Sequence, residues 1–88
     1  MGIIALTLKI MPNGPDTDIA LIKDQVGKKL SEKYDIKDIR EFNIGFGLKS
    51  IEILLTFSDK TGSTDEIENT LRSIPGVASV EQEDMTLL

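Results

Sequence analysis

The sequence predicts an α+β protein: a ferredoxin-like β-α-β-β-α-β two-layer sandwich, with a four-stranded antiparallel sheet and two helices on one face. Two observations predict it. Four segments alternate apolar and polar residues as half-buried strands do, and two others repeat apolar residues at helical spacing. Two helices with one apolar stripe each can cover only one face of such a sheet. With 88 residues, we expect residues 1–88 to form a single domain.

The first strand is expected over residues 4–10, because its apolar residues share one face: Ile4, Leu6, Leu8 and Ile10. The sequence MPNGPD ends this strand, and Asp16 or Thr17 can cap the helix that follows. The apolar stripe of that helix consists of Ile19, Ile22, Val26 and Leu30. Gly27 inside the helix costs about 1 kcal/mol relative to alanine and suggests close packing.

The second strand places Phe42, Ile44 and Phe46 on one face, and Gly45 and Gly47 interrupt its end. Alternation resumes over residues 49–57, where the inward positions are Ile51, Ile53, Leu55 and Phe57. Right-handed crossovers then place the first and third strands in the centre of the sheet. The sheet face without helices is expected to carry Ala5, Thr7, Lys9, Ser50, Glu52, Leu54 and Thr56.

The second helix is expected to begin at a cap, Ser63 or Thr64, and to stop at the Pro-Gly pair of residues 75–76. Its buried stripe consists of Ile67, Leu71 and Ile74. The last strand begins near Val77, with Ala78 and Val80 pointing inward.

Composition excludes several function classes. The chain has no cysteine and no histidine, which excludes disulfides, thiolate zinc sites and Cys or His nucleophiles. No D-x-D-x-D-G loop is present to order a calcium ion, so neither a metal nor another cofactor is expected. Residues 50–88 carry two basic and eight acidic side chains, and an acidic protein is a poor candidate for binding nucleic acid.

The N-terminal sequence MGIIALTLKIM is too short to span a bilayer and is typical of a strand. We therefore expect a cytoplasmic protein that makes no membrane contact.

The sequence FNIGFGLKSI, residues 42–51, resembles the corresponding stretch in the nucleotide-exchange domain of translation elongation factor 1-beta. The resemblance extends through LTLKIMP at 6–12, GSTDEIENTL at 62–71 and IPGVASVE at 74–81. The chain length is similar to that of the short archaeal members, which consist of the exchange domain alone.

This resemblance implies a guanine-nucleotide exchange factor that promotes replacement of GDP by GTP on translation elongation factor 1-alpha during polypeptide elongation. Such a factor is not an enzyme in the covalent sense and is expected to be a monomer when free. The implied GTPase-binding residues of the central stretch are Phe42, Gly45, Phe46, Gly47 and Lys49.

The C-terminal sequence EDMTLL departs from the eukaryotic members, which have a lysine next to the last residue where this chain has Leu87. That lysine is thought to enter the magnesium and phosphate region of the GTPase. Apolar chain ends often mark a contact, so Met85, Leu87 and Leu88 are expected to bind the GTPase. The alternative is a frayed end that contributes nothing.

Other interpretations stay open. Aromatic residues at strand spacing are usually core, which would give Phe42 and Phe46 a purely structural role. The same topology also occurs in small-ligand-binding regulatory domains, the alternative function. RNA recognition is the weakest rival, because the bare sheet face offers no clear aromatic pair.

Overall fold

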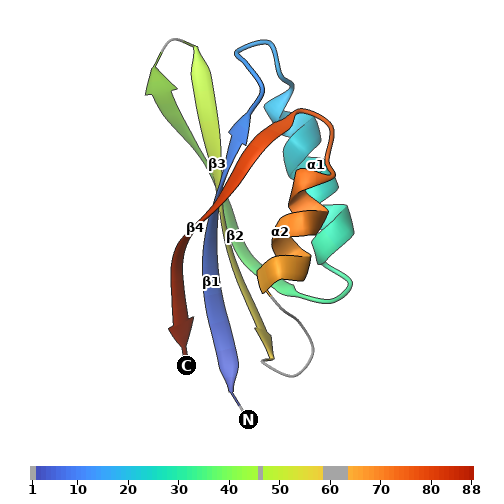
Figure 1. Ribbon diagram of the computed structural model, residues 1–88, viewed down its shortest axis with the longest axis vertical. Coiled ribbons are helices and arrows are strands. Elements are labelled where there is room, and N and C mark those ends of the chain that lie inside the picture. Colours follow the sequence, from blue (N-terminus) through green and yellow to red (C-terminus); the bar gives the residue numbers. More distant parts are fainter. Residues whose placement is uncertain (1, 46, 59–63) are drawn as a thin grey trace.

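The computed structural model describes residues 2–45, 47–58 and 64–88. The elements in order are β1 (Ile3–Pro12), α1 (Ile19–Leu30), β2 (Asp35–Gly45), β3 (Leu48–Ser58), α2 (Thr64–Arg72) and β4 (Val77–Leu87). The strands form one sheet in the order β2-β3-β1-β4, and every neighbouring pair is antiparallel. Both helices lie on the same face of this sheet (Figure 1). The fold predicted from the sequence is confirmed, including the central position of β1 and β3.

The core lies between the helices and the two central strands. Of the residues predicted to be inward on β1 and β3, Ile4 is partly buried and the other seven are buried, namely Leu6, Leu8, Ile10, Ile51, Ile53, Leu55 and Phe57. They pack in one cluster with Ile22, Val26 and Leu30 of α1 and with Ile67 and Leu71 of α2. Tyr34, which lies outside the predicted strands and helices, also belongs to this cluster. Its ring meets that of Phe57 edge to face, with centroids 5.6 Å apart.

The N-cap of helix α1 lies one or two residues later than the sequence suggested. Asp18 is the N-cap, and its carboxylate accepts a hydrogen bond from the backbone N–H of Leu21 at 3.2 Å. Asp16 and Thr17 are therefore not the caps. Instead, the hydroxyl of Thr17 accepts a hydrogen bond from the backbone N–H of Gly14 at 3.2 Å, which closes the turn before the helix.

Gly27 does not provide the close packing expected of it. Among the described residues, no atom outside its own stretch of helix lies within 4 Å of the position that a Cβ would take. Gly76 is the glycine that is closely packed. Its φ is +95°, and a Cβ there would lie 2.9 Å from Cγ2 of Thr17. The turn between α2 and β4 therefore requires glycine at position 76.

Strand β4 differs from the prediction at its start. Val77 pairs with Pro12 and Ser79 pairs with Met11, so the register shifts across Ala78. This irregularity lets both Val77 and Val80 pack against the core, whereas Ala78 is exposed. The inward position predicted for Ala78 is wrong, and that of Val80 is confirmed.

Helix α2 also ends earlier than expected, at Arg72. Ile74 is buried in the turn that follows, where its backbone N–H bonds to the carbonyl of Leu71 at 3.2 Å. Thr64 is the first helical residue, and the alternative cap Ser63 lies outside the described residues. Neither helix in the described part of the chain has the length and apolar character needed to cross a membrane.

The strands are longer than the helices that cover them, and this difference shapes the molecule. The strands have 10 or 11 residues at about 3.3 Å each, whereas the helices have 12 and 9 residues at about 1.5 Å each. The β2–β3 hairpin extends past the helices at one end of the sheet (Figure 1). The chain termini lie at the opposite end, and the longest dimension of the molecule is 43 Å.

Candidate functional site

The hairpin between β2 and β3 carries most of the predicted site residues. Asn43 pairs with Lys49 and Gly45 pairs with Leu48, with a register shift between the two pairs. Gly45 and Gly47 have φ of +96° and +76°, a region that side-chain-bearing residues rarely adopt. The backbone conformation of the turn therefore explains why glycine occupies these two positions. Phe46 lies between them and outside the described residues, so its predicted contact is not addressed by the structure.

Phe42 lies on the sheet face that the helices leave uncovered. It pairs across the strands with Ser50, whose chain neighbour Ile51 points into the core. Directly paired residues share a face, so Phe42 and Ser50 both point away from the helices. Phe42 is 43% exposed, although Ser50 beside it is buried. The interpretation of Phe42 as core is wrong, and an exposed aromatic ring is available at this end of the sheet.

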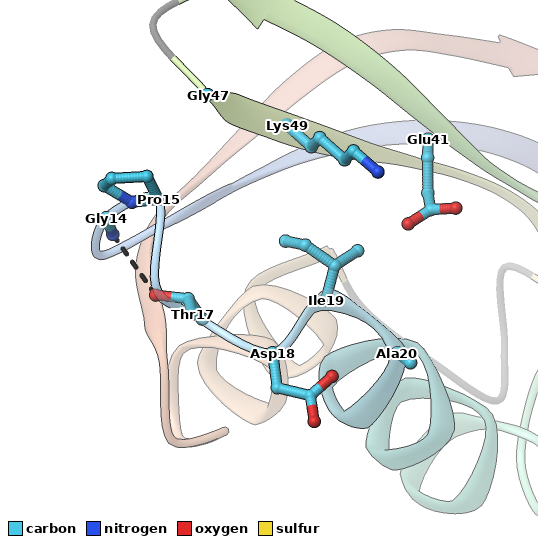
Figure 2. Close-up of a pocket in the computed structure, with 9 residues that line it drawn as sticks. All are labelled: Gly14, Pro15, Thr17, Asp18, Ile19, Ala20, Glu41, Gly47 and Lys49. Atoms are coloured by element: carbon cyan, nitrogen blue, oxygen red, sulfur yellow. Dashed lines mark hydrogen bonds between the residues drawn. The ribbon is translucent and has the colours of Figure 1, made fainter.

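Lys49 lies on the opposite face of the hairpin, because it has the same alternation as Ile51 and Ile53. There it lines a pocket of about 340 Å³ between the hairpin and the start of α1 (Figure 2). The pocket is lined by Gly14, Pro15, Thr17, Asp18, Ile19, Ala20, Glu41, Gly47 and Lys49. The hairpin thus presents Phe42 on one face and Lys49 on the other.

The pocket wall opposite the hairpin is the turn between β1 and α1, which several contacts fix. The backbone N–H of Asn13 donates to the carbonyl of Gly76 at 2.9 Å, in addition to the Gly14–Thr17 bond. Glu41 of β2, which lines the pocket, pairs with Lys23 of α1 at 3.6 Å. Sequence reasoning missed this wall. The turn-forming sequence MPNGPD was visible, but nothing in it indicated that the turn faces the hairpin.

The C-terminal residues are ordered rather than frayed. Met85 pairs with Leu6 and Leu87 pairs with Ile4, and the backbone N–H of Leu88 donates to the carbonyl of Ile3 at 2.7 Å. The side chains remain open to solvent, since Met85, Leu87 and Leu88 are 50%, 69% and 72% exposed. The backbone is paired while the side chains are exposed because β4 is an edge strand, with a sheet neighbour on one side only.

The structure does not bring the two predicted parts of the site together. The hairpin lies at one end of the sheet and the C-terminus lies at the other (Figure 1). Phe42 and Met85 also point to opposite faces, because Met85 pairs with the inward residue Leu6. A single partner could contact both parts only by extending along the 43 Å length of the molecule.

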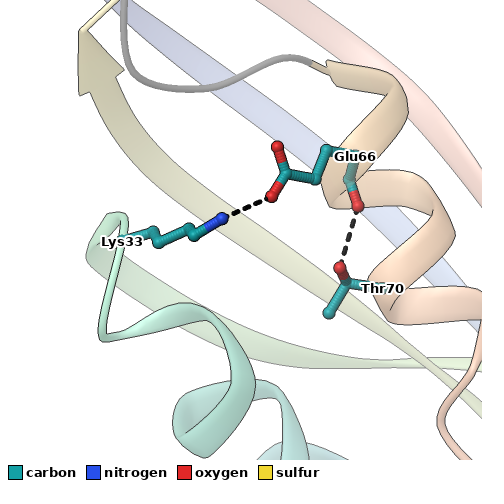
Figure 3. A network of polar contacts seen from close by, with 3 residues as sticks. All are labelled: Lys33, Glu66 and Thr70. Carbon is teal, nitrogen blue, oxygen red and sulfur yellow. Dashed lines mark hydrogen bonds and ion pairs between the residues drawn. The ribbon is translucent and has the colours of Figure 1, made fainter.

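The charged network between the helices is remote from the hairpin. The Nζ of Lys33 donates to Oε1 of Glu66 at 2.7 Å, and the hydroxyl of Thr70 donates to the Glu66 carbonyl at 2.9 Å (Figure 3). The hydrogen bond and the attraction of Glu66 raise the pKa of Lys33 above its usual value, whereas burial raises the pKa of Tyr34. This network joins the turn after α1 to α2 and belongs to the scaffold.

The described residues contain no group of three or more carboxylates placed to hold a metal ion. The features that remain are an exposed aromatic ring, a lysine in a pocket and an ordered apolar edge. Exposed aromatic and apolar side chains of this kind are typical of protein–protein contact surfaces.

Comparison with known proteins gives consistent results over nearly the whole chain. Residues 5–88 match the family model described as the EF-1 guanine nucleotide exchange domain. The chain is 40% identical to a protein named Elongation factor 1-beta from Thermoplasma acidophilum over 88 residues, which cover both chains completely. A protein of the same name from Methanosphaerula palustris is 42% identical over 87 residues, 99% of each chain. Another, from Methanothermobacter thermautotrophicus, is 32% identical over 88 residues, 100% of this chain and 99% of the relative.

Proposed function

The chain belongs to the family of EF-1 guanine nucleotide exchange domains, and from this premise we propose that it promotes replacement of GDP by GTP on elongation factor 1-alpha. The observation that carries the proposal is the family match over residues 5–88, together with relatives that match from end to end. These similarities do not favour a small-ligand-binding regulatory domain. The proposal includes a single exchange domain over residues 1–88, a monomer when free, that acts in the cytoplasm.

Exchange of this kind needs no covalent chemistry from the factor. An exchange protein can bind the nucleotide-free GTPase more tightly than the GDP-bound form. By thermodynamic reciprocity, it must then weaken GDP binding by the ratio of these two affinities. To weaken GDP about a hundredfold, the factor must bind the empty GTPase more favourably by about 3 kcal/mol. A few well-placed contacts supply that much, so a small acidic protein without catalytic side chains is adequate.

The hairpin is the proposed primary contact. Phe42 supplies an exposed aromatic ring, the type of side chain that most often dominates the energy of a protein interface. Gly45 and Gly47 shape the turn through their positive φ values, and Lys49 supplies a positive charge. Phe46, which lies between the two glycines, is proposed as a further contact on the resemblance alone.

Equilibrium binding tests this proposal. The affinity of the protein for elongation factor 1-alpha is measured by calorimetry, once with the GTPase free of nucleotide and once with it saturated by GDP. We expect the nucleotide-free form to bind about a hundredfold more tightly. Equal affinity for both forms would rule out an exchange factor, and absence of binding to either form would rule out this partner.

The C-terminal residues are proposed as a second contact. We expect deletion of residues 85–88 to slow stimulated GDP release by at least about tenfold, which corresponds to about 1.4 kcal/mol. The physical reason is the loss of three exposed apolar side chains and of the strand end that positions them near the acidic residues of β4. Release of a fluorescent GDP analogue at subsaturating factor measures the effect.

Because residues 85–87 pair with β1, the deletion needs a control that keeps the backbone. The double substitution Leu87→Ser and Leu88→Ser leaves the strand in place and removes two of the three exposed apolar side chains. We expect it to reproduce most of the loss, and we expect Leu87→Lys not to impair exchange. Full activity of both the truncated protein and the double-serine variant would eliminate the tail as a contact and leave the hairpin as the working surface.

A further inference from the structure

Lys49 differs from most basic residues of the described part of the chain because it forms no ion pair there. Among the residues that the structure describes, six basic side chains form ion pairs with acidic residues, namely Lys23, Lys28, Lys33, Lys37, Arg40 and Arg72. Within residues 2–45, 47–58 and 64–88, the basic residues without an ion pair are Lys9, Lys29 and Lys49. Of these three, only Lys49 lines the pocket of about 340 Å³ beside α1.

The acidic groups of that pocket are already engaged. Glu41 pairs with Lys23 at 3.6 Å, so its charge is compensated from α1. Asp18 caps the helix, and the partial positive charge of the helix N-terminus offsets the negative charge of the Asp18 carboxylate. Figure 2 shows the Asp18 carboxylate pointing away from Lys49 and Glu41. Among the described residues, Lys49 is therefore the charged group at the rim of the pocket that takes part in no ion pair, although the Glu41 carboxylate lies on the same side (Figure 2).

The remaining surface of the pocket is suited to a short aliphatic stem. Figure 2 shows the Ile19 side chain pointing toward Lys49, and Pro15 and Ala20 add further apolar atoms to the lining. The turn that carries Pro15 is fixed by its backbone bonds to Thr17 and Gly76, so the pocket exists before any partner arrives. A preformed pocket with apolar walls and one cation at its rim is complementary to a carboxylate at the end of methylene groups.

We propose that this pocket receives an aspartate or glutamate side chain of the GTPase, which pairs with Lys49. The inference rests on the proposed exchange function and adds the chemistry of the group that the hairpin recognises. A phosphate is the less suitable anion. It would bring about two negative charges next to Asp18 and Glu41, on a protein whose net charge is already −5. The ion pair with Lys49 thus fixes the position of the GTPase along the hairpin. Phe42 contacts the GTPase on the other face of the sheet.

The test is the affinity of the full chain for nucleotide-free elongation factor 1-alpha, measured by calorimetry. Lys49→Met keeps most of the length of the unbranched side chain and removes its charge. We expect its Kd to rise at least about tenfold, because a charged hydrogen bond is lost. Lys29→Met is the matched control, since Lys29 is an exposed, unpaired lysine of α1 outside the pocket. Its Kd is expected to stay within about threefold of the wild type.

A second variant tests the shape of the pocket without changing a charge. Ala20 is exposed on α1 and lines the pocket, so Ala20→Leu fills the space while keeping a good helix former. Ala20→Leu is expected to weaken binding about as much as Lys49→Met. The salt dependence of binding is a separate measurement, and we expect the Kd of Lys49→Met to depend less on salt concentration than the Kd of the wild type.

Three results would overturn the inference. Wild-type affinity in Lys49→Met and Ala20→Leu would exclude the pocket while leaving the exchange function intact. A loss that appears only with GDP-bound GTPase would assign Lys49 to a nucleotide phosphate. Absence of binding by the wild-type protein itself would remove the exchange function and the pocket assignment together.

Discussion

Replacing Phe42 by alanine is expected to slow stimulated GDP release by at least about thirtyfold while leaving the melting curve nearly unchanged. An aromatic side chain at the centre of a protein interface typically contributes about 2 kcal/mol or more, which corresponds to that factor. Phe42 is 43% exposed on the face without helices, so its truncation opens no cavity in the core. The measurement is release of a fluorescent GDP analogue from elongation factor 1-alpha at subsaturating factor, paired with thermal unfolding of the variant.

Leu54→Ala is the matched control for Phe42→Ala. Leu54 is a large apolar residue on the same uncovered face and is 37% exposed, but it lies towards the middle of the sheet, opposite Thr7. It is expected to retain normal exchange. If Phe42→Ala loses several kcal/mol of stability and its folded fraction still exchanges normally, Phe42 has a structural role and the interface assignment fails.

Replacing Ile53 by alanine is expected to lower the free energy of unfolding by about 2–5 kcal/mol, because it leaves a cavity in a close-packed core. Ile53 is fully buried and pairs with Leu8 on one side and with Ile39 on the other. For a domain of this size such a loss is a large part of the total stability. Urea unfolding followed by circular dichroism measures it.

The neighbouring residue in the same strand provides the comparison. Leu54→Ala removes a similar volume from the opposite face, where no helix covers the sheet, and is expected to cost less than about 1 kcal/mol. A loss below about 0.5 kcal/mol for Ile53→Ala would mean that position 53 is not part of the core. Equal losses at positions 53 and 54 would contradict a sheet that is covered on one face only.

The regular elements could be predicted from the sequence because their burial follows a strict period. The alternation Ile51, Ile53, Leu55 assigns the covered face of β3 residue by residue, and the spacing of Ile22, Val26 and Leu30 does the same for α1. Prediction from this periodicity fails where the backbone departs from regular strand or helix geometry. The register shift at Ala78 reversed the expected orientation there, and an exposed Asp18 capped the helix where Asp16 and Thr17 were equally plausible by residue type.

The face of Phe42 could not be predicted, because β2 is an edge strand with a weak pattern. Near the hairpin end of β2, Phe42 and Ile44 alternate with polar residues as core residues do. The pairing with Ser50 nevertheless places Phe42 on the uncovered face. The pocket at Lys49 was equally hidden. It requires residues about 30 positions apart, from the β1–α1 turn and from the hairpin, and no local signal relates them. The glycines were the exception, since the positive φ of Gly45 and Gly47 is what a Gly-x-Gly turn suggests.

The most direct measurement is the rate at which a fluorescent GDP analogue leaves elongation factor 1-alpha in the presence of excess unlabelled GDP, with and without the wild-type protein. An exchange factor acting through differential affinity is expected to raise the release rate by about a hundredfold or more at saturation, with the rate rising with factor concentration until it levels off. The same titration with Phe42→Ala should shift to higher concentrations or level off at a lower rate. A release rate that stays at the spontaneous value at every concentration of the wild-type protein would contradict the exchange function.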